Sequence, residues 1–144
     1  MELKNNESCP SCGQYKNRAL TVDAVIVKDG KILLIKRGRE PYKGFWGNAG
    51  GYVDHDETAE DAAIRETFEE TGLIAKSIKF IGLYTDPKRH PEQAVSAAYA
   101  LEVEGEPKAG DDAVEIKWFD IDKLPPLAFD HEKIIGDYLK KIRK

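Results

Sequence analysis

The sequence predicts an α+β fold in which helices cover a mixed β-sheet. Strand-like runs outnumber helical ones, and several of them separate the two helical stretches. In addition, Asp29-Gly30 joins two β-rich runs within residues 19–37 and is a strong short hairpin signal. At 144 residues the chain has room for one such domain with a core of its own.

The other elements follow from end signals and periodicity. After a glycine-rich stretch at 44–53, a helix is predicted from Thr58 to Thr71, because Thr58 begins a capping-box pattern and Gly72 can end the helix in a left-handed conformation. Further strands are predicted at residues 75–85, 94–103 and 114–120. Apolar side chains at helical spacing predict a C-terminal helix: Ile134, Ile135, Tyr138, Leu139 and Ile142.

Composition and charge exclude some partners. The formal net charge is −4, so a large basic surface for duplex DNA or an anionic membrane is not expected, although a locally positive site can still bind a small anion. The polar N-terminus lacks the apolar region of a secretion signal, and no later window resembles a membrane span. We therefore expect a cytoplasmic protein with no nucleic-acid or membrane partner.

Residues 1–18 are predicted to form a polar tail or small knuckle ahead of the main domain, residues 19–144. Cys9 and Cys12 lie there in Cys-Pro-Ser-Cys-Gly, which is half of a zinc ribbon. Because the chain has no second cysteine pair, a reduced pair without metal is favoured. Zinc shared by two chains, with help from a histidine, is the alternative.

Three glutamates crowd the predicted helix. A helix advances about 100° per residue, so Glu66, Glu69 and Glu70 lie on one face. Alanines lie on the same stripe one and two turns earlier, which indicates close approach of other backbone: Ala59, Ala62 and Ala63. Like charges in such a setting repel one another. A bound Mg²⁺ would reverse the sign, and we prefer that interpretation to a solvated acidic face.

Residues 51–73, GYVDHDETAEDAAIRETFEETGL, resemble the Nudix box of the Nudix hydrolases. The pattern is Gly51, five residues, Glu57, seven residues, Arg65-Glu66, two residues, Glu69-Glu70, one residue and Gly72-Leu73. Two positions depart from it. Thr67 stands where the family usually has a bulky aliphatic residue, and Ala49 stands where a proline commonly precedes the two glycines.

The resemblance implies a Nudix-type α/β/α sandwich around a mixed β-sheet. It also implies hydrolysis of a nucleoside diphosphate linked to another moiety, with Mg²⁺ or Mn²⁺ as cofactor, and makes a homodimer a reasonable expectation. By the same resemblance the metal ligands are Glu66, Glu69, Glu70 and the Gly50 carbonyl. Glu57 supports the site, and Arg65 holds a glutamate in position.

The general base stays open. In the family it is either a box glutamate or an acidic residue in a loop outside the box. We include Glu115 among the catalytic candidates, with Asp111, Asp112 and Glu92 as loop alternatives, and spacing does not choose among them.

Pro87 stands fourteen residues after Leu73, which is similar to the pattern in ADP-ribose pyrophosphatases. This favours ADP-ribose as substrate, cut to AMP and ribose 5-phosphate. The alternatives are a pyrophosphohydrolase acting on (d)NTPs or other nucleotides, and a nucleotide-sugar sensor that binds without cleaving.

Several residues outside the box are candidates for substrate binding. Arg37 and Arg39 end a predicted strand just before the glycine-rich stretch and can meet terminal phosphates. Aromatic rings able to stack on an adenine, unless they belong to the core, are Phe45, Trp46 and Tyr84. His90 and His131 are expected at the surface, in a loop and at a helix start.

Overall fold

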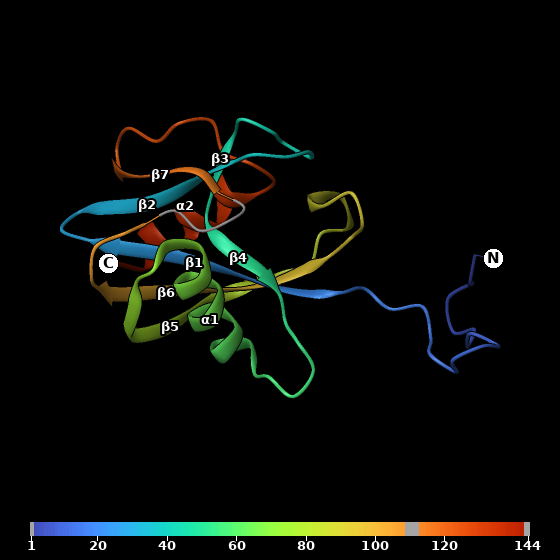
Figure 1. Ribbon diagram of the computed structural model, residues 1–144. Helices are drawn as coiled ribbons and strands as arrows, with labels where there is room; N and C mark the ends of the chain where they lie inside the picture. Colours follow the sequence, from blue (N-terminus) through green and yellow to red (C-terminus); the bar gives the residue numbers. More distant parts are fainter. Residues whose placement is uncertain (1, 109–112, 143–144) are drawn as a thin grey trace.

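The computed structural model describes residues 2–108 and 113–142 and shows two helices on opposite faces of a mixed sheet (Figure 1). The elements are β1 Leu20–Lys28, β2 Lys31–Arg37, β3 Trp46–Gly47, β4 Ala49–Tyr52, α1 Ala59–Thr71, β5 Ile74–Tyr84, the short 3₁₀ helix η1 Pro87–Arg89, β6 Val95–Glu104, β7 Ala113–Asp120 and α2 His131–Ile142. The predicted α+β sandwich is confirmed, and each predicted strand and helix is present within about two residues of its expected bounds.

Strand β1 is the centre of the sheet. It runs parallel to β6 along its whole length and antiparallel to two strands on its other side. There β4 occupies the first half, with Asp23 opposite Gly50, and β2 occupies the second half, with Ile26 opposite Leu33. Strand β7 joins β2, and β5 joins β6. This arrangement places the glycines of β4 beside the middle of the sheet.

The predicted hairpin and helix ends are confirmed by the backbone. Asp29 and Gly30 both have positive φ, 52° and 74°, as a two-residue hairpin of this type requires. At the start of α1 the Thr58 hydroxyl accepts a hydrogen bond from the Asp61 N–H at 3.1 Å. At its end Gly72 is left-handed (φ 75°) and donates to the Phe68 carbonyl.

Helix α1 buries small side chains and leaves its large apolar ones outside. Its buried residues are Ala62, Ala63, Thr67 and Thr71, whereas the side chain of Phe68 is 57% exposed. The helix axis can therefore lie close to the sheet, as the alanine stripe predicted. The carboxylates on the same helix reach the strand backbone as a result.

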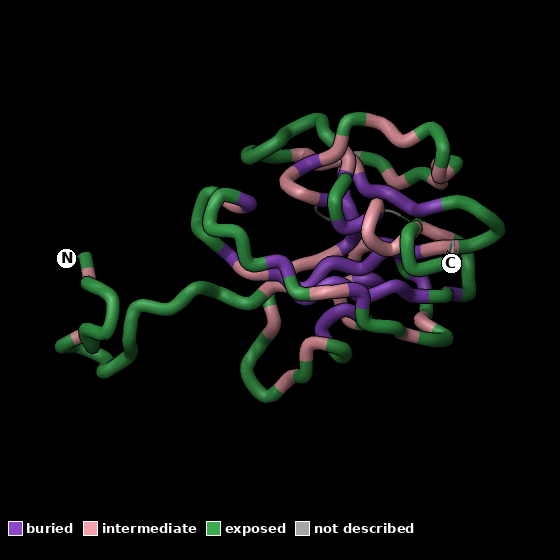
Figure 2. The backbone as a smooth tube through the Cα atoms, turned by 180° about the vertical axis from the view of Figure 1, so that it is seen from behind, coloured by how far each residue is buried: buried purple, intermediate pink, exposed green. Residues whose placement is uncertain are grey.

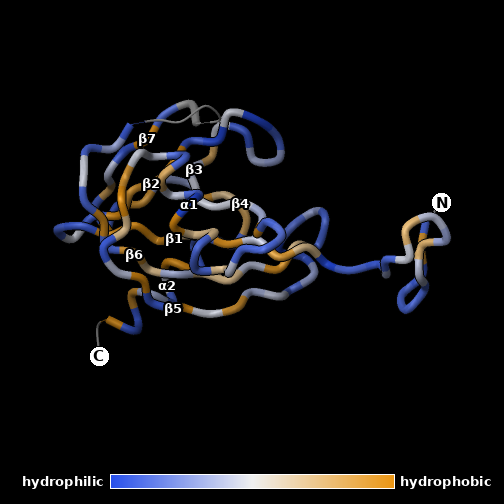
Figure 3. Tube along the Cα trace, turned by 60° about the horizontal axis from the view of Figure 1, so that its bottom comes forward, coloured by the Kyte–Doolittle hydropathy of each residue, from blue (hydrophilic) through white to orange (hydrophobic). Residues whose placement is uncertain are grey.

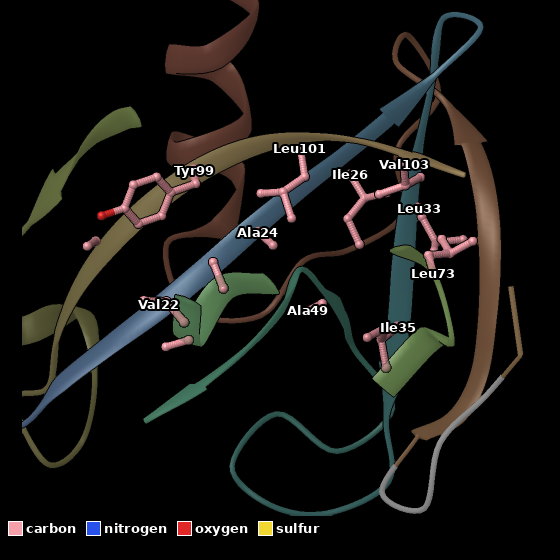
Figure 4. Close-up of a cluster of buried hydrophobic side chains, with 13 residues drawn as sticks. Val22, Ala24, Ile26, Leu33, Ile35, Ala49, Leu73, Tyr99, Leu101 and Val103 are labelled. Atoms are coloured by element: carbon pink, nitrogen blue, oxygen red, sulfur yellow. The ribbon is translucent and has the colours of Figure 1, made fainter. Parts of the chain in front are cut away.

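Successive side chains of β1 point to opposite faces of the sheet and contribute to two hydrophobic cores. Val22, Ala24 and Ile26 face α1, in the cluster drawn in Figure 4. Val25 faces α2 and packs with a second cluster that includes Ile134. Buried residues consequently fill the middle of the molecule, with exposed ones at its edges (Figure 2). Burial on both faces stabilises the sheet that carries the site.

The segment before β1 runs away from the sheet and ends in a small hairpin (Figures 1 and 3). It is exposed along almost all of its length. Arg18 donates from Nε to the Gln93 carbonyl at 2.7 Å, close to where the segment enters the sheet. Among the described residues, no helix has the length and apolar content needed to span a bilayer.

Candidate active site

The last two turns of α1 lie against β4 and bring the glutamates to the strand backbone. A Cβ on Gly51 would lie 2.6 Å from Oε1 of Glu66, so this carboxylate occupies the space that a side chain would fill. The Gly50 N–H lies 3.4 Å from Oε2 of Glu70. Glu69 points outward, with its side chain 55% exposed. The missing side chain of Gly51 is therefore what allows Glu66 to sit this close to the sheet.

Arg65 donates hydrogen bonds to three of the acidic residues. Its Nε and Nη2 hold Glu57 through both carboxylate oxygens, at 2.7 and 3.0 Å. Its Nη1 donates to Glu66 at 2.8 Å and to Glu69 at 3.2 Å. Nη2 also reaches the Tyr52 carbonyl, at 3.1 Å. One guanidinium thus connects α1, the loop before it and β4. Its hydrogen bonds to the Glu57 carboxylate lower the pKa of Glu57 to about 2, and a hydrogen bond from the Asp54 N–H acts in the same direction.

The pKa of Glu70 is shifted in the opposite direction from that of Glu57. Burial, followed by the charge of Glu66 and a hydrogen bond to it, raises the pKa of Glu70 to about 9. Glu70 therefore favours its protonated form at neutral pH, beside the Glu66 side chain. A divalent cation can replace that proton and neutralise both groups, so the donor set fits Mg²⁺ or Mn²⁺. Within the described ranges no group of three or more acidic, histidine or cysteine side chains is already arranged around an ion position. Arg65 pairs with three of the glutamates, Glu57, Glu66 and Glu69.

A cavity of about 700 Å³ lies between β5, η1 and the length of α2 from Lys133 to Lys141. Tyr84 and Phe129 supply ring surface to it. Its cationic lining residues are Lys88, Arg89, Lys133, Lys140 and Lys141. Two of its acidic residues are already paired: Asp130 with Arg89, and Asp137 with Tyr84 and Lys133. With Asp86 the cavity has three acidic lining residues, fewer than its cationic ones, although the chain as a whole carries a net charge of −4.

Arg37 and Phe129 connect this cavity to the glutamates. The Arg37 guanidinium lies 5.0 Å from the centre of the Phe129 ring, and His90 stacks with that ring at 5.1 Å. Arg37 also feels the charge of Glu70. Burial lowers the pKa of Arg37, the charge of Arg39 lowers it further, and Glu70 opposes both. A ligand that fills the cavity and passes Arg37 would reach the box.

Beneath the site, Asp23 is buried in a polar network. It accepts a hydrogen bond from the Ser96 hydroxyl at 2.5 Å and one from Nε2 of His131 at 3.1 Å. Nδ1 of His131 accepts the Asn48 N–H at 3.0 Å, which leaves the imidazole neutral with its proton on Nε2. Because that amide lies between β3 and β4, the network fixes the strand that carries the site glycines.

Arg89 supplies the positive charge of this network. Its guanidinium holds both oxygens of Asp130, at 2.7 and 2.8 Å, and lies 3.7 Å from Asp23. Burial alone would raise the pKa of Asp23. The His131 and Ser96 hydrogen bonds and the nearby Arg89 outweigh burial, so the pKa of Asp23 lies below its ordinary value.

The residues predicted to bind substrate end up in different places. Arg37 and Tyr84 lie at the cavity or beside it. Trp46 packs edge-on against Phe119, 4.9 Å away, and lies against the core on the α2 side, which is the alternative that the sequence left open for it. Pro87 begins η1 and is exposed, and it is its neighbours that line the cavity.

Phe45 and Arg39 remain near the entrance. Phe45 is exposed and meets the edge of Tyr42 at 5.6 Å, and Tyr42 lies 4.8 Å from Phe129. Arg39 is exposed in the same loop, two residues beyond Arg37.

The candidate bases differ in position. Glu115 is exposed on β7, opposite Lys36. Glu92 lies 3.5 Å from the Tyr52 hydroxyl, which places it close to the end of β4. Asp111 and Asp112 lie outside the described residues.

Sequence reasoning missed the network. His131 begins α2 as expected, but it is 5% exposed and not at the surface. The charged Asp23 within the apolar run TVDAVIV is a signal that could have identified a buried ionic site. Phe129, Asp130 and Arg89 lie in loops, and nothing in their local pattern indicates their neighbours.

Comparison with known proteins decides the family. A model described as NUDIX domain matches residues 17–138. The chain belongs to the NUDIX family. The resemblance of residues 51–73 to the Nudix box is thereby confirmed. Among curated relatives, an ADP-ribose pyrophosphatase of Methanocaldococcus jannaschii is 51% identical over 128 residues, 88% of this chain and 76% of the relative. The NAD-capped RNA hydrolase NudC of Chromobacterium violaceum is 34% identical over 83% of this chain, and the match spans only 45% of NudC.

Solved NUDIX structures share the fold. The NUDIX domain of Shewanella oneidensis NrtR, in complex with ADP ribose, has a TM-score of 0.82 and 27% identity, with 93% of each chain covered. A bifunctional NMN adenylyltransferase/ADP ribose pyrophosphatase from Francisella tularensis, complexed with AMP and a manganese ion, has a TM-score of 0.75 and 28% identity over 88% of this chain and 42% of that one.

Proposed function

We propose that this NUDIX protein hydrolyses the pyrophosphate bond of ADP-ribose, giving AMP and ribose 5-phosphate, with Mg²⁺ or Mn²⁺. The observation that carries the proposal is the Glu66–Glu70 pair, held against two glycines beside a positively charged cavity. The relative named ADP-ribose pyrophosphatase and the NrtR domain bound to ADP ribose support this choice of substrate. Free thiols at Cys9 and Cys12 are compatible with the cytoplasmic location that forms part of the proposal.

The metal would be held by Glu66, Glu69, Glu70 and the Gly50 carbonyl. When bound, it supplies positive charge to the diphosphate oxygens and lowers the pKa of a water next to the phosphorus. Arg65 is a positioning residue, because its fork fixes Glu57 and restricts Glu66 and Glu69.

The remaining residues would orient the substrate. The cavity fits a nucleoside, with Phe129 and Tyr84 as apolar walls. Arg37 stands between the cavity and Glu70, where a diphosphate would pass, and its planar guanidinium can hold two phosphate oxygens. The acceptor of the proton from the attacking water is a box glutamate or one of Glu92, Asp111, Asp112 and Glu115, and variants at each position decide among them.

A substrate panel tests the proposal. Purified protein is incubated with ADP-ribose, other ADP-sugars, NADH, dinucleoside polyphosphates and (d)NTPs, with Mg²⁺, with Mn²⁺ and with EDTA, and products are separated by ion-exchange chromatography. We expect the highest kcat/KM for ADP-ribose, equal amounts of AMP and ribose 5-phosphate, and no turnover in EDTA. Reaction in ¹⁸O-labelled water then shows which phosphorus is attacked.

Two alternatives are outcomes of the same panel. An oxidised purine nucleoside triphosphate hydrolase of Danio rerio is 35% identical over 77% of this chain, so turnover of triphosphates alone would replace ADP-ribose as the substrate. Binding of ADP-ribose in calorimetry without turnover of any compound would instead indicate a sensor.

A further inference from the structure

The N-terminal hairpin contains the only two cysteines of the chain and lies outside the region that matches the NUDIX model. Ser8 and Tyr15 pair across it, and the Cys9 N–H donates to the Gln14 carbonyl at 2.7 Å. The Gly13 N–H returns to the Cys9 carbonyl at 2.8 Å, and Gly13 itself is left-handed, with φ 76°. The residues between the cysteines are thus folded into a tight turn.

This turn brings both sulfur atoms and two amides together. The N–H groups of Cys12 and Ser11 hydrogen-bond the Cys9 sulfur, and the Cys12 thiol also bonds to it. Amide donors of this kind favour the thiolate, and the pKa of the Cys9 thiol is lowered accordingly. Two sulfur ligands on one side of a turn, with amides directed at the first, are half of a tetrahedral zinc–thiolate site.

Residues 2–108 and 113–142 offer no second half of the site near this hairpin. Throughout the described part of the chain, no group of three or more histidine, cysteine or acidic side chains is placed to hold an ion. Cys9 and Cys12 are both free, Cys12 is exposed, and the hairpin stands clear of the sheet in each view (Figures 1 and 3). A second hairpin can approach it without disturbing the domain.

We propose that one Zn²⁺ joins two copies of this protein through Cys9 and Cys12 of each copy. The sequence favoured a pair without metal because it contains no second pair. The structure changes that preference, since the half-site is already formed and faces outward. The site does not depend on the proposed ADP-ribose activity.

Metal titration of the full-length chain tests the proposal. Protein is reduced, stripped with a chelator and titrated with Co²⁺ and then Zn²⁺. We expect saturation at one ion per two chains, with the strong sulfur-to-cobalt absorption of a tetrahedral thiolate site, which carboxylate-bound Co²⁺ in the NUDIX box does not give. Light scattering after chromatography at low micromolar concentration should give twice the chain mass with Zn²⁺ and a lower mass with the chelator.

Variants provide the controls. Cys9→Ser and Cys12→Ser should abolish the sulfur-to-cobalt absorption and the zinc-dependent change in mass, whereas Ser8→Ala, in the same hairpin, should keep both. Thermal unfolding of all three should match the wild type, because the hairpin lies outside the domain core. The proposal is overturned by a ratio of one thiolate-bound ion per single chain, by absorption that survives in Cys9→Ser, by an unchanged mass with Zn²⁺, or by no binding at micromolar Zn²⁺.

Discussion

Glu66 and Glu70 form a pair whose charge is balanced only in part. Arg65 donates to Glu66, whereas Glu70 lies beside Glu66 and within hydrogen-bond reach of the Gly50 N–H. Its neighbour Glu69 is exposed and paired with Arg65. The cluster therefore combines Glu70, whose pKa is raised, with Glu57, whose pKa is lowered by Arg65, and this difference gives two predictions.

The stability of the metal-free protein should depend on pH through Glu70. The pKa of Glu70 is about 9 in the folded chain and near 4.5 when unfolded, so between these values folding takes up a proton. Rising pH through that window consequently lowers the free energy of unfolding. Glu70→Gln should flatten this dependence and raise the melting temperature at pH 9 by several degrees, measured by calorimetry in EDTA. Glu69→Gln is the control, and an identical pH slope in wild type and Glu70→Gln would contradict the shift.

Substitutions of the box glutamates should lower activity, although Glu70→Gln is expected to raise stability at high pH. Glu69→Gln or Glu70→Gln removes an anionic oxygen donor from the proposed metal site. We expect kcat/KM to fall by roughly 10²–10³-fold or more, the effect of losing one group that stabilises developing charge. The far-UV circular dichroism should be unchanged. Near-normal turnover of either variant at saturating Mg²⁺ would show that the assigned role is wrong.

At the scale of elements, the site depends on how closely α1 lies to β4. The small buried residues of α1 permit that approach, and the glycines of β4 leave room for the carboxylates. Gly50 and Gly51 differ in what a side chain would meet. A Cβ at Gly51 meets the mobile end of Glu66, at 2.6 Å, whereas a Cβ at Gly50 meets the Val22 backbone carbonyl at 2.2 Å.

These neighbours predict different outcomes for two alanine variants. Gly51→Ala should leave unfolding in urea nearly unchanged, because Glu66 can turn away, but should weaken Mg²⁺ binding about 10–100-fold by displacing that carboxylate. Gly50→Ala should lower the free energy of unfolding by roughly 1–3 kcal/mol, because backbone must shift. Isothermal titration with Mg²⁺ and urea unfolding measure the two effects.

Gly136 provides the matched control. Gly136 lies inside α2, and a Cβ at this position would meet no atom within 4 Å. Gly136→Ala should therefore stabilise the protein by about 0.5–1 kcal/mol without affecting Mg²⁺ binding. If Gly51→Ala bound Mg²⁺ as tightly as Gly136→Ala, the proposed role of the close approach would fail.

For the whole molecule, the buried network around Asp23 connects the layers. It joins β1 and β6 to the first residue of α2, and through the Asn48 amide it reaches the β3–β4 junction. Arg89 brings in η1 and the loop that precedes α2. The cavity walls and the strand behind the metal site therefore share one set of polar contacts.

Breaking this network should lower global stability. His131→Ala removes a hydrogen bond from the buried Asp23 carboxylate and leaves the Asn48 N–H without its acceptor. We expect a loss of roughly 1.5–3 kcal/mol in the free energy of unfolding, the range for a hydrogen bond to a charged group. His131→Gln, which can keep part of the pairing, should lose less. Urea unfolding makes the comparison, and a loss below 1 kcal/mol for His131→Ala would show that the network is not needed.

The sequence by itself determined the order of elements, the family and the acidic stripe. Periodicity, the Asp29-Gly30 turn and the Thr58 and Gly72 caps are local, and local backbone preferences decide them. The box spacing is local too, because a single helix carries most of it.

Only the tertiary structure decided what lies opposite these elements. It assigned Trp46 to the core, buried His131 against Asp23, and brought Phe129 and Arg89 to the cavity from loops far along the chain. It also folded Cys9 and Cys12 into a preformed half-site. The pairings of Asp23, Trp46 and the cavity residues join segments distant in sequence, so no local pattern encodes them. The cysteine spacing was visible in the sequence, but the direction of the amides toward sulfur depends on the three-dimensional turn.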